Sequence, residues 1–510
     1  MPLSAAIRAS EAQERLRKPL RVGNRERSFR NRASHDSLAW LLLVAGSGSG
    51  ARSADPLAGA TDVWSGAGAD DNWSTAANWS LNRPPDPGDD VIMAGTTRLT
   101  PVHDLAAGLA LRSLHFNDGG FTLSGNSFSA QDILNAVAAV NTIAAPIWVM
   151  TATQPIRSNA GGTLVLSGAV GESAPTGGIF KLGAGTVILS APNTYTGLTE
   201  VQEGTLVAAS AGALGSTAAG TRVQSGATLE LQGGVVINGE ALELVNGGAL
   251  NNVGNNAFGA PVVIASAGTI GSSSGTLTVI GDISGPGNLT KAGLGTVVLI
   301  NQHTYLGTTT VALGTLVVES DSGLGGSTSG TTVQAGGTLA FQGGVNYASP
   351  EALTISGMGV SGGAIQNVSG NNTFAGPVTL ADHSTILSSA GTLTLSAPFS
   401  LQGFSAIFDG AGSSIVSGVI GGTGTLAKAS AGTLTLTAAN TMGGNAGGRG
   451  DAPRERHAER AGDGLRGRHP GGNRGNDGGR HRGGRDDHSD HGQPHGCLPG
   501  LSVGAYVHHR

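Results

Sequence analysis

Apolar and polar residues alternate along most of this chain in short segments, each opened by a small residue followed by threonine. Examples are GGTLVLSG from Gly161, AGTVILSA from Ala184 and EGTLVAAS from Glu203. Alternation with a period of two, bounded by Gly, Asn, Ser or Pro, is typical of β-strands. Helical spacing of apolar residues is nearly absent from the body of the chain, so the pattern predicts an all-β protein.

The same strands recur in a longer arrangement. The segment KLGAGTVILSAPNTYTGLTEVQEGTLVAAS, which starts at Lys181, returns 110 residues later as KAGLGTVVLINQHTYLGTTTVALGTLVVES from Lys291. A third and shorter copy, KASAGTLTLTAANT, starts at Lys428. Coils of roughly twenty residues therefore build larger blocks, and a stack of coils tolerates irregular insertions because each coil contacts only its neighbours. We place the copies near residues 178–283, 285–396 and 422–441.

Composition favours a β-solenoid over other all-β folds. Gly supplies 86 of the 510 residues, while charged residues make up only 12%. Stacked coils bury a continuous column of Val, Leu and Ile, glycine suits the tight corners, and like charges stacked one coil apart would repel. A β-sandwich or a propeller also has short strands and Gly-rich turns, but neither explains the irregular insertions as well. We expect the N-terminal cap of the solenoid over residues 55–160 and its repeats over 161–441.

Charge is divided unevenly along the chain, and its N-terminal part indicates export. Residues 1–54 carry ten basic and four acidic residues, and an apolar core over 38–45 follows an Arg-rich flank. Small residues at Ala51 and Ser53 suit cleavage by a signal peptidase, so we assign 1–54 to a leader with a signal peptide.

The folded part of the chain is acidic, because residues 55–440 carry eight basic and 22 acidic residues. This excess disfavours nucleic acid and anionic lipid as partners of the folded part.

The repeated segments resemble a known family. The pattern Lys-x-Gly/Ser-x-Gly-Thr, followed by Asn-Thr-Tyr-x-Gly, Thr-Thr-x-Val and a Gly-Thr-Leu strand, is similar to the autotransporter-associated β-strand repeat, also called the passenger-associated transport repeat. The segment WSGAGADDNWSTAANWS…PPDPGDDVIMAG (64–95) resembles the usual N-terminal start of such passengers. The second copy has His303 where the pattern has Asn, and the third copy is truncated. The positions that carry the resemblance are Lys181, Thr186, Asn193, Tyr195, Lys291, Thr296, Tyr305, Lys428, Thr433 and Asn440.

The resemblance implies a right-handed parallel β-helix, exported as the passenger of an autotransporter to the surface of a Gram-negative-type cell. Such passengers normally cross the outer membrane through a C-terminal β-barrel, and the repeat is implicated in passenger folding and transport. Residues after 440 show no ten-residue alternating strands, so we expect that this chain lacks the barrel and any transmembrane segment. We expect a non-enzymatic surface stalk or adhesin without cofactor or metal, whose partners are glycans or proteins on other cells.

A polysaccharide-active β-helix enzyme or a carbohydrate-binding surface protein stays open as the alternative. A sugar-cleaving cleft needs clustered carboxylates with Arg or Lys on one face. Between residues 160 and 440 only Arg222 and the three repeat lysines are basic, which argues against such a cleft there. The body also lacks a nucleophile motif such as G-x-S-x-G, so we predict no catalytic residue. Its histidines are His103, His115, His303 and His383.

Two groups of side chains near the start of the folded part are weak candidates for binding. Trp64, Trp73 and Trp79 either form a face on which sugars stack or cover the open end of the apolar column, and we favour the second interpretation. Loop carboxylates bind Ca²⁺ in many proteins, and the densest ones here are Asp70, Asp71, Asp89 and Asp90. They lack the Gly/Asp nonapeptide of calcium-binding β-rolls, so we favour solvated turn residues.

The repeat pattern breaks after Thr441. Residues 442–510 are rich in Gly, Arg and His, contain the single Cys497 and lack strand-forming runs, which predicts a disordered tail. GC-rich codons for Gly-Thr spell Arg-His when they are read one base early, and Arg-His recurs in the tail, so we hypothesise a frameshift. A genuine basic tail that binds metal or nucleic acid is the alternative. The RGD tripeptide at Arg449–Asp451 matches an integrin-binding motif, but it recurs easily by chance in this composition.

Overall fold

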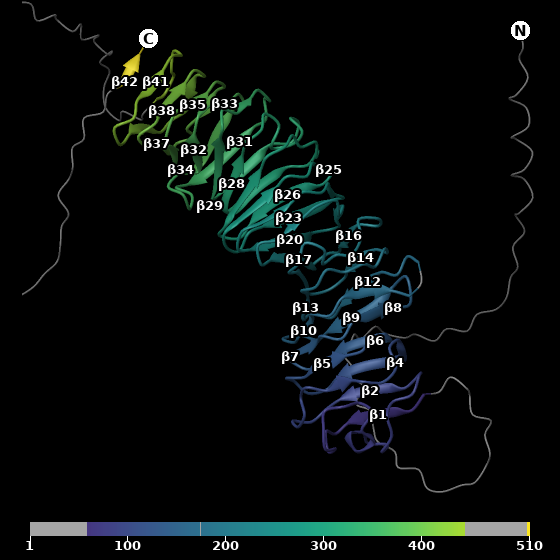
Figure 1. Cartoon of the computed structure of the whole chain (residues 1–510). Coiled ribbons are helices and arrows are strands. Elements are labelled where there is room, and N and C mark those ends of the chain that lie inside the picture. The colour runs from purple at the N-terminus through teal and green to yellow at the C-terminus, as the bar shows by residue number, and fades with distance from the viewer. Residues whose placement is uncertain (1–58, 174, 444–506, 510) are drawn as a thin grey trace, which may run out of the picture. The chain divides into compact units, whose positions relative to one another are not determined.

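The computed structural model describes residues 59–173, 175–443 and 507–509. Within them the chain forms an all-β parallel solenoid of about 16 turns, which confirms the predicted fold class (Figure 1). The predicted leader over 1–54 and nearly all of the predicted tail over 442–510 lie outside the described residues. The boundary between a cap and the repeats at 160/161 stays a prediction, because one run of paired strands passes through it.

Each coil crosses three columns of strands in turn, and strands pair in parallel with those on neighbouring coils. The register is regular, as Thr163, Thr186, Thr205 and Thr228 open four successive strands and lie opposite one another. These threonines head the repeated sequence unit, so one unit forms one side of one coil. Long strands such as β28 (Thr309–Val318) run from one column onto the next.

The bounds of the strands follow the three columns. The first column contains β1 (Thr61–Trp64), β2 (Asp90–Met93), β4 (Leu109–Phe116), β6 (Phe128–Asn135), β9 (Gln154–Ser158), β12 (Ile179–Leu182), β14 (Thr199–Val201), β16 (Thr221–Val223), β19 (Leu242–Leu244), β22 (Val262–Ile264), β25 (Ile283–Ser284), β30 (Asn346–Tyr347), β33 (Asn371–Phe374), β35 (Thr392–Leu395), β38 (Ser413–Val416), β41 (Leu434–Leu436) and β42 (Val507–His509). The second contains β3 (Val102–His103), β5 (Thr122–Gly125), β7 (Val140–Ile143), β10 (Thr163–Leu166), β13 (Thr186–Leu189), β15 (Thr205–Ala208), β17 (Thr228–Gln232), β20 (Gly248–Val253), β23 (Ala267–Gly271), β26 (Asn288–Ala292), β28, β29 (Thr331–Gln342), β31 (Leu353–Gly357), β34 (Val378–Ser388), β36 (Phe399–Ser400) and β39 (Ile420–Gly421). The third contains β8 (Ile147–Val149), β11 (Val170–Glu172), β18 (Val236–Ile237), β21 (Asn256–Phe258), β24 (Thr276–Val279), β27 (Thr296–Leu299), β32 (Ile365–Ser369), β37 (Ser405–Asp409) and β40 (Thr425–Lys428). One short 3-10 helix, η1, spans Ala76–Asn78.

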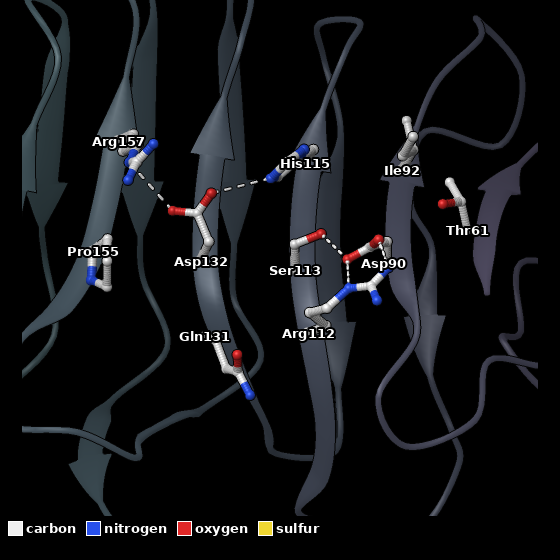
Figure 2. A pocket seen from close by; sticks show the side chains of 10 residues that line it. All are labelled: Thr61, Asp90, Ile92, Arg112, Ser113, His115, Gln131, Asp132, Pro155 and Arg157. Atoms are coloured by element: carbon white, nitrogen blue, oxygen red, sulfur yellow. Dashed lines mark hydrogen bonds and ion pairs between the residues drawn. The ribbon is translucent and has the colours of Figure 1, made fainter. Parts of the chain in front are cut away.

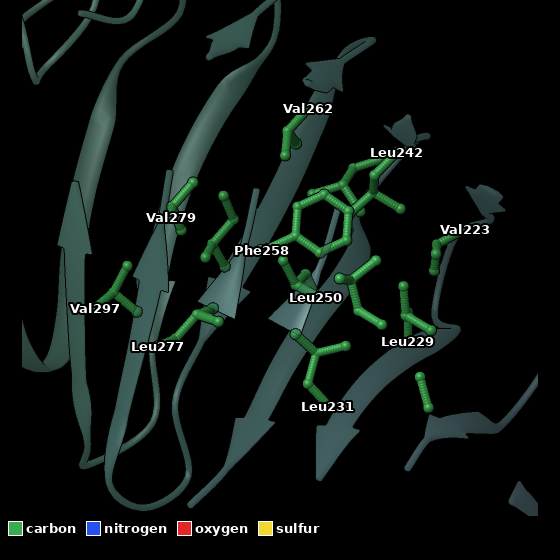
Figure 3. Packing of buried hydrophobic residues seen from close by; sticks show 14 of the residues in the cluster. Val223, Leu229, Leu231, Leu242, Leu250, Phe258, Val262, Leu277, Val279 and Val297 are labelled. Atoms are coloured by element: carbon green, nitrogen blue, oxygen red, sulfur yellow. The ribbon is translucent and has the colours of Figure 1, made fainter. Parts of the chain in front are cut away.

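The core lies inside the coils and is built from alternate residues of the strands. In the second column Leu206, Leu229, Leu250 and Ile270 lie in register on successive coils, and all four are buried. Figure 3 shows Leu229 and Leu250 beside Phe258, which comes from the third column. Burying one such aliphatic side chain stabilises the fold by about 1.5–3 kcal/mol. The alternation seen in the sequence therefore causes the coils to stack.

The three repeat copies begin in three different columns, although their sequences match. Lys181 lies in the first column, where the following coils place Val201, Val223, Leu244 and Ile264. Lys291 pairs with Ile270, which belongs to β23 in the second column. Lys291 therefore lies in the second column. Lys428 pairs with Phe408 in the third column. Because a block is not a whole number of coils, each copy begins one side further round the solenoid.

Candidate functional site

Charged side chains gather on the outer surface of the first column over β2, β4, β6 and β9 (Figure 2). They border a hollow of about 530 Å³. Sequence analysis missed this cluster because neighbouring strands bring together residues that lie roughly twenty positions apart in the chain. The residues that line the hollow are Thr61, Asp90, Ile92, Arg112, Ser113, His115, Gln131, Asp132, Pro155 and Arg157.

Asp90 is tied to one arginine at one end of this cluster. Arg112 donates from Nε to Asp90 Oδ1 over 2.8 Å, and its Nη2 contacts the other carboxylate oxygen. Ser113 Oγ donates to the same Oδ1 over 2.7 Å. The hydrogen bond from Arg112 is the main cause that holds the pKa of Asp90 below its ordinary value. Asp90 is therefore an ionised carboxylate, and both of its oxygens already accept hydrogen bonds.

Asp132 forms the other half of the cluster. Its Oδ2 lies 3.2 Å from His115 Nε2, and its Oδ1 lies 3.3 Å from Arg157 Nε. Asp90, Ser113 and Asp132 occupy the same register position on three successive strands. Strands lie ~4.8 Å apart, so the two aspartates are separated by about 10 Å along the column. Two arginines balance two aspartates, which leaves the cluster without excess charge.

The repeat lysines lie inside the solenoid, where backbone carbonyls surround their ammonium groups. Lys181 Nζ donates to the carbonyl oxygens of Leu182, Gly183 and Glu203 over 2.6–3.1 Å. Lys291 Nζ makes the three equivalent contacts, and both lysines are fully buried. Burial lowers the pKa of each to about 8. Lys428 is less buried and contacts the two carbonyls that directly follow it. The lysines therefore close a turn of the backbone.

The asparagine position of the repeat joins neighbouring coils. Asn193 accepts a hydrogen bond from the Val170 amide over 2.8 Å and donates to the Ala213 carbonyl over 2.5 Å. His303 replaces it in the second copy and accepts from the Ile283 amide through Nδ1 over 3.1 Å. Its Nε2 is buried without a partner, and burial lowers the pKa of His303 to about 4. Asn440 accepts from the Ile420 amide in the same way.

The remaining repeat positions are a buried tyrosine and the threonine that opens a strand. Tyr195 and Tyr305 share a hydrogen bond with Thr199 and Thr309 respectively, over 2.6 and 2.5 Å. Burial raises the pKa of both phenols, which keeps them neutral. Thr186 and Thr296 open the strands that follow the lysine turns, and Thr433 directly precedes β41. The ten repeat positions thus lie at three separate places and form no common site.

The three tryptophans near the start of the solenoid are buried in its core. Trp64 and Trp73 each pack edge-on against Trp79, with ring centroids 5.1 and 5.3 Å away. Trp79 Nε1 donates to the Trp73 carbonyl over 2.7 Å. No ring face of these residues is open to solvent, so the sugar-stacking interpretation does not apply to them. Trp148, which sequence analysis did not single out, is instead 41% exposed on β8.

The acidic residues considered for Ca²⁺ bind separate partners. Asp71 pairs with Arg98 and Asp89 with Arg83, each over 2.8 Å. Asp70 accepts from Thr75 Oγ1 over 2.6 Å. Asp89 is buried, which differs from the solvated turn residue that we favoured. In the ranges 59–173, 175–443 and 507–509 no group of three or more His, Cys, Asp or Glu is placed to hold a metal ion. His508 and His509 lie on β42, whereas the other tail histidines, Cys497 and Arg449–Asp451 lie outside those ranges.

Two buried glutamates were also missed by sequence analysis. Thr221 Oγ1 donates to Glu240 over 2.8 Å, and Thr331 Oγ1 donates to Glu351 over 2.5 Å. The Tyr347 hydroxyl also donates to Glu351. Burial raises the pKa of Glu240 to about 7 and raises that of Glu351. The signal was present in the duplication, since Glu-Ala-Leu occurs at 240–242 and again at 351–353.

Pairs of buried asparagines reveal a further copy of the block. In each pair the amide of the second residue donates to the side-chain oxygen of the first, and the amide of the first contacts a serine one coil later. One pair lies before residue 161, so the internal repetition reaches into the expected cap, where sequence similarity is too weak to show it. The pairs are Asn135 with Asn141, Asn252 with Asn256, and Asn367 with Asn372.

Comparison with known proteins identifies the repeats. The family model described as Passenger-associated-transport-repeat matches residues 179–208, 289–318 and 426–447. These matches contain the three lysine turns on β12, β26 and β40. No curated protein and no solved structure matches the chain. Among the helical elements of the described part, none is long and apolar enough to cross a membrane. The chain thus carries three passenger-associated transport repeats, the family that its Lys-x-Gly/Ser-x-Gly-Thr pattern indicated.

Proposed function

We propose that this protein is an exported, non-enzymatic autotransporter passenger, or a fragment of one, that acts as a surface stalk or adhesin on a Gram-negative-type cell. The observation that carries the proposal is the continuous stack of parallel coils that contains all three matched repeats. In such a stack each coil is stabilised by its neighbours, so length is gained without enlarging a single core. This property suits a protein that must extend from a surface.

The ionisation of the carboxyl groups supports a non-enzymatic role. Hydrolysis of a glycosidic bond needs one carboxyl with a raised pKa as general acid and a second as base or nucleophile. Asp90 has a lowered pKa because Arg112 is bound to it. The carboxyls with raised pKa values, Glu240 and Glu351, are 3% and 1% exposed in the core and cannot reach a polysaccharide.

Location and adhesion test the main proposal. The producing bacterium is fractionated, and intact cells are labelled with an antibody raised against the purified protein. We expect the protein in the outer-membrane or extracellular fraction, and beads coated with the full chain should attach to cell layers. A protein confined to the cytoplasm overturns the proposed export, and beads that bind no better than albumin-coated beads overturn the adhesive role.

A polysaccharide-active enzyme is the second candidate. The aspartates of the charged cluster favour it, because Asp90 and Asp132 share one outer face two strands apart. Their backbones are separated by about 10 Å along the column, and the carboxyl groups of inverting glycosidases lie ~6.5–9.5 Å apart. Incubation of the purified chain with soluble polysaccharides, followed by a reducing-end assay, separates the two candidates. We expect no new reducing ends, and their release, abolished by Asp132→Asn, would replace the non-enzymatic proposal with the enzymatic one.

A further inference from the structure

Three hollows adjoin one another on the outside of the N-terminal coils. The hollow beside the charged cluster shares Gln131 with a second hollow of about 590 Å³. The second shares Ala110 and Met150 with a third hollow of about 430 Å³, which Trp148 borders. The shared residues join the hollows into one continuous surface, which we call the N-terminal track. It is defined by Arg112, Gln131, Asp132, Trp148, Met150 and Arg157.

Trp148 presents an exposed ring at one end of the track. It pairs with Gly171 on the next coil, and a Cβ at Gly171 would lie only 2.9 Å from the indole. The ring therefore lies against a position without a side chain. Indole rings offer a large apolar face together with one polar N–H group. Ser129 and Glu172 border the same hollow and supply polar groups beside the ring.

The other end of the track offers polar groups that are already fixed in place. Arg112 is bound to Asp90, and Arg157 and His115 contact Asp132, so their orientations are set before any ligand arrives. The pairs balance in charge, and the folded part as a whole is acidic, so an anionic ligand gains little there. The exposed amide of Gln131 lies between the two ends. Such a surface suits a ligand with many hydroxyl groups and no charge.

We propose that the N-terminal track binds a neutral glycan. One sugar ring stacks on the Trp148 indole, and the hydroxyls of the following sugars exchange hydrogen bonds with Gln131 and with the paired Arg and Asp side chains. The track crosses strands on several successive coils, so it accommodates an oligosaccharide rather than a single sugar. This inference deepens the proposed adhesive function by naming a ligand class, and it rests on that function for its biological setting.

Affinity electrophoresis of the purified full chain tests the inference. The protein migrates through native gels that contain dextran, galactomannan, arabinoxylan or β-1,3-glucan, with alginate and heparin as anionic probes. We expect retardation by at least one neutral polysaccharide and none by the anionic ones. Trp148→Ala should weaken that retardation by about tenfold through loss of the aromatic contact. Gln131→Ala should weaken it to a smaller extent.

Two further variants separate binding from folding. Gly171→Ala places a methyl group under the indole and shifts the ring, so it should weaken binding while far-UV circular dichroism stays that of the wild type. Val140→Ala is the matched control, because Val140 is 56% exposed on β7 of the same coil but lies outside the track. This control should bind as the wild type does.

The inference fails if no neutral polysaccharide retards the protein, or if Trp148→Ala and Val140→Ala behave alike. Retardation by heparin or alginate alone, lost in high salt, would replace the neutral glycan with an anionic one. A protein that reaches the cell surface but binds no glycan overturns this inference and leaves the proposed export intact. A protein that binds glycan but stays in the cytoplasm overturns the proposed export and leaves this inference intact.

Discussion

The buried glutamate Glu240 makes the stability of the solenoid depend on pH. Its ordinary pKa of 4.5 is raised to about 7 by burial in the folded state. The unfolded chain therefore loses this proton at a lower pH than the folded chain does. The contribution of Glu240 to stability is complete below pH 4.5 and is lost as the pH rises through 7. The difference between the two pKa values corresponds to about 3 kcal/mol of unfolding free energy.

Glutamine at this position removes the ionisation and preserves the shape of the side chain. Glu240→Gln keeps an oxygen that accepts the hydrogen bond from Thr221 Oγ1. His303, whose pKa burial lowers to about 4, gains stability over the same pH range and opposes Glu240 in the wild type. We therefore expect that, between pH 4.5 and pH 8, the urea unfolding free energy of the wild type falls by about 3 kcal/mol relative to that of Glu240→Gln. Glu351, whose pKa is raised in the same direction as that of Glu240, and His303 are present in both proteins, so their contributions cancel in this comparison.

Glu243→Gln is the matched control, because Glu243 lies on the outside of β19 and pairs with Arg222 over 2.7 Å. Exposed pairs of this kind contribute about 0–1 kcal/mol, and Glu240 stays intact in this variant, so the pH dependence should persist. Solenoids unfold in parts, so hydrogen exchange of amides in β16 and β19 should accompany the urea curves. The same pH dependence of stability in the wild type and in Glu240→Gln would refute the reasoning.

Three further predictions follow from the interior of the repeats. His303→Asn should stabilise the protein by about 1 kcal/mol, because it removes an unpartnered buried nitrogen, and Asn193→His should cost a similar amount. A less stable His303→Asn or a more stable Asn193→His in urea unfolding would contradict this. Gly226→Ala should cost about 1 kcal/mol for its φ of 75° alone, whereas Gly293→Ala, at the same φ but with a Cβ 2.3 Å from a carbonyl oxygen, should cost several times more; equal losses of stability would show that strain at φ dominates. Lys181→Met leaves three carbonyls without their donor and should cost about 3 kcal/mol; an unchanged melting temperature would show that the carbonyls find other partners.

The fold was predictable because its cause is local in the sequence. A strand such as Thr186–Leu189 has period-two alternation, and its threonine recurs at the head of the next strands. The similar segments that begin at Lys181 and Lys291 then indicated the passenger-associated transport repeat. The column in which each copy stands was not predictable, because it depends on the lengths of all the coils between copies, and each corner adds or removes a residue or two.

The candidate site was less visible for a different reason. Asp90 and Asp132 come to the same outer face only because the chain makes two coils from one residue to the other, and no motif marks their relation. Trp148 looks like a core residue in the run IWV, and only the structure shows that it points outward. By contrast, the tryptophans that attracted attention, such as Trp73, are the ones that the core covers. Composition shows which chemistry is available, while the register decides which groups share a surface.

The placement of the lysine turns in three different columns says how a repeat acts. Two acceptors of Lys181 are the carbonyls directly after it, and the third, that of Glu203, comes from the next coil. Lys291 has the same arrangement in another column. The lysine turn therefore needs only the repeat and the coil that follows it, and it forms on either side of the solenoid. An apolar column alone accepts a new coil in several registers, whereas a buried ammonium is satisfied in only one. We infer that the first two repeats each fix the register of the coil that follows them, which is the property that a chain needs when it folds progressively from one end.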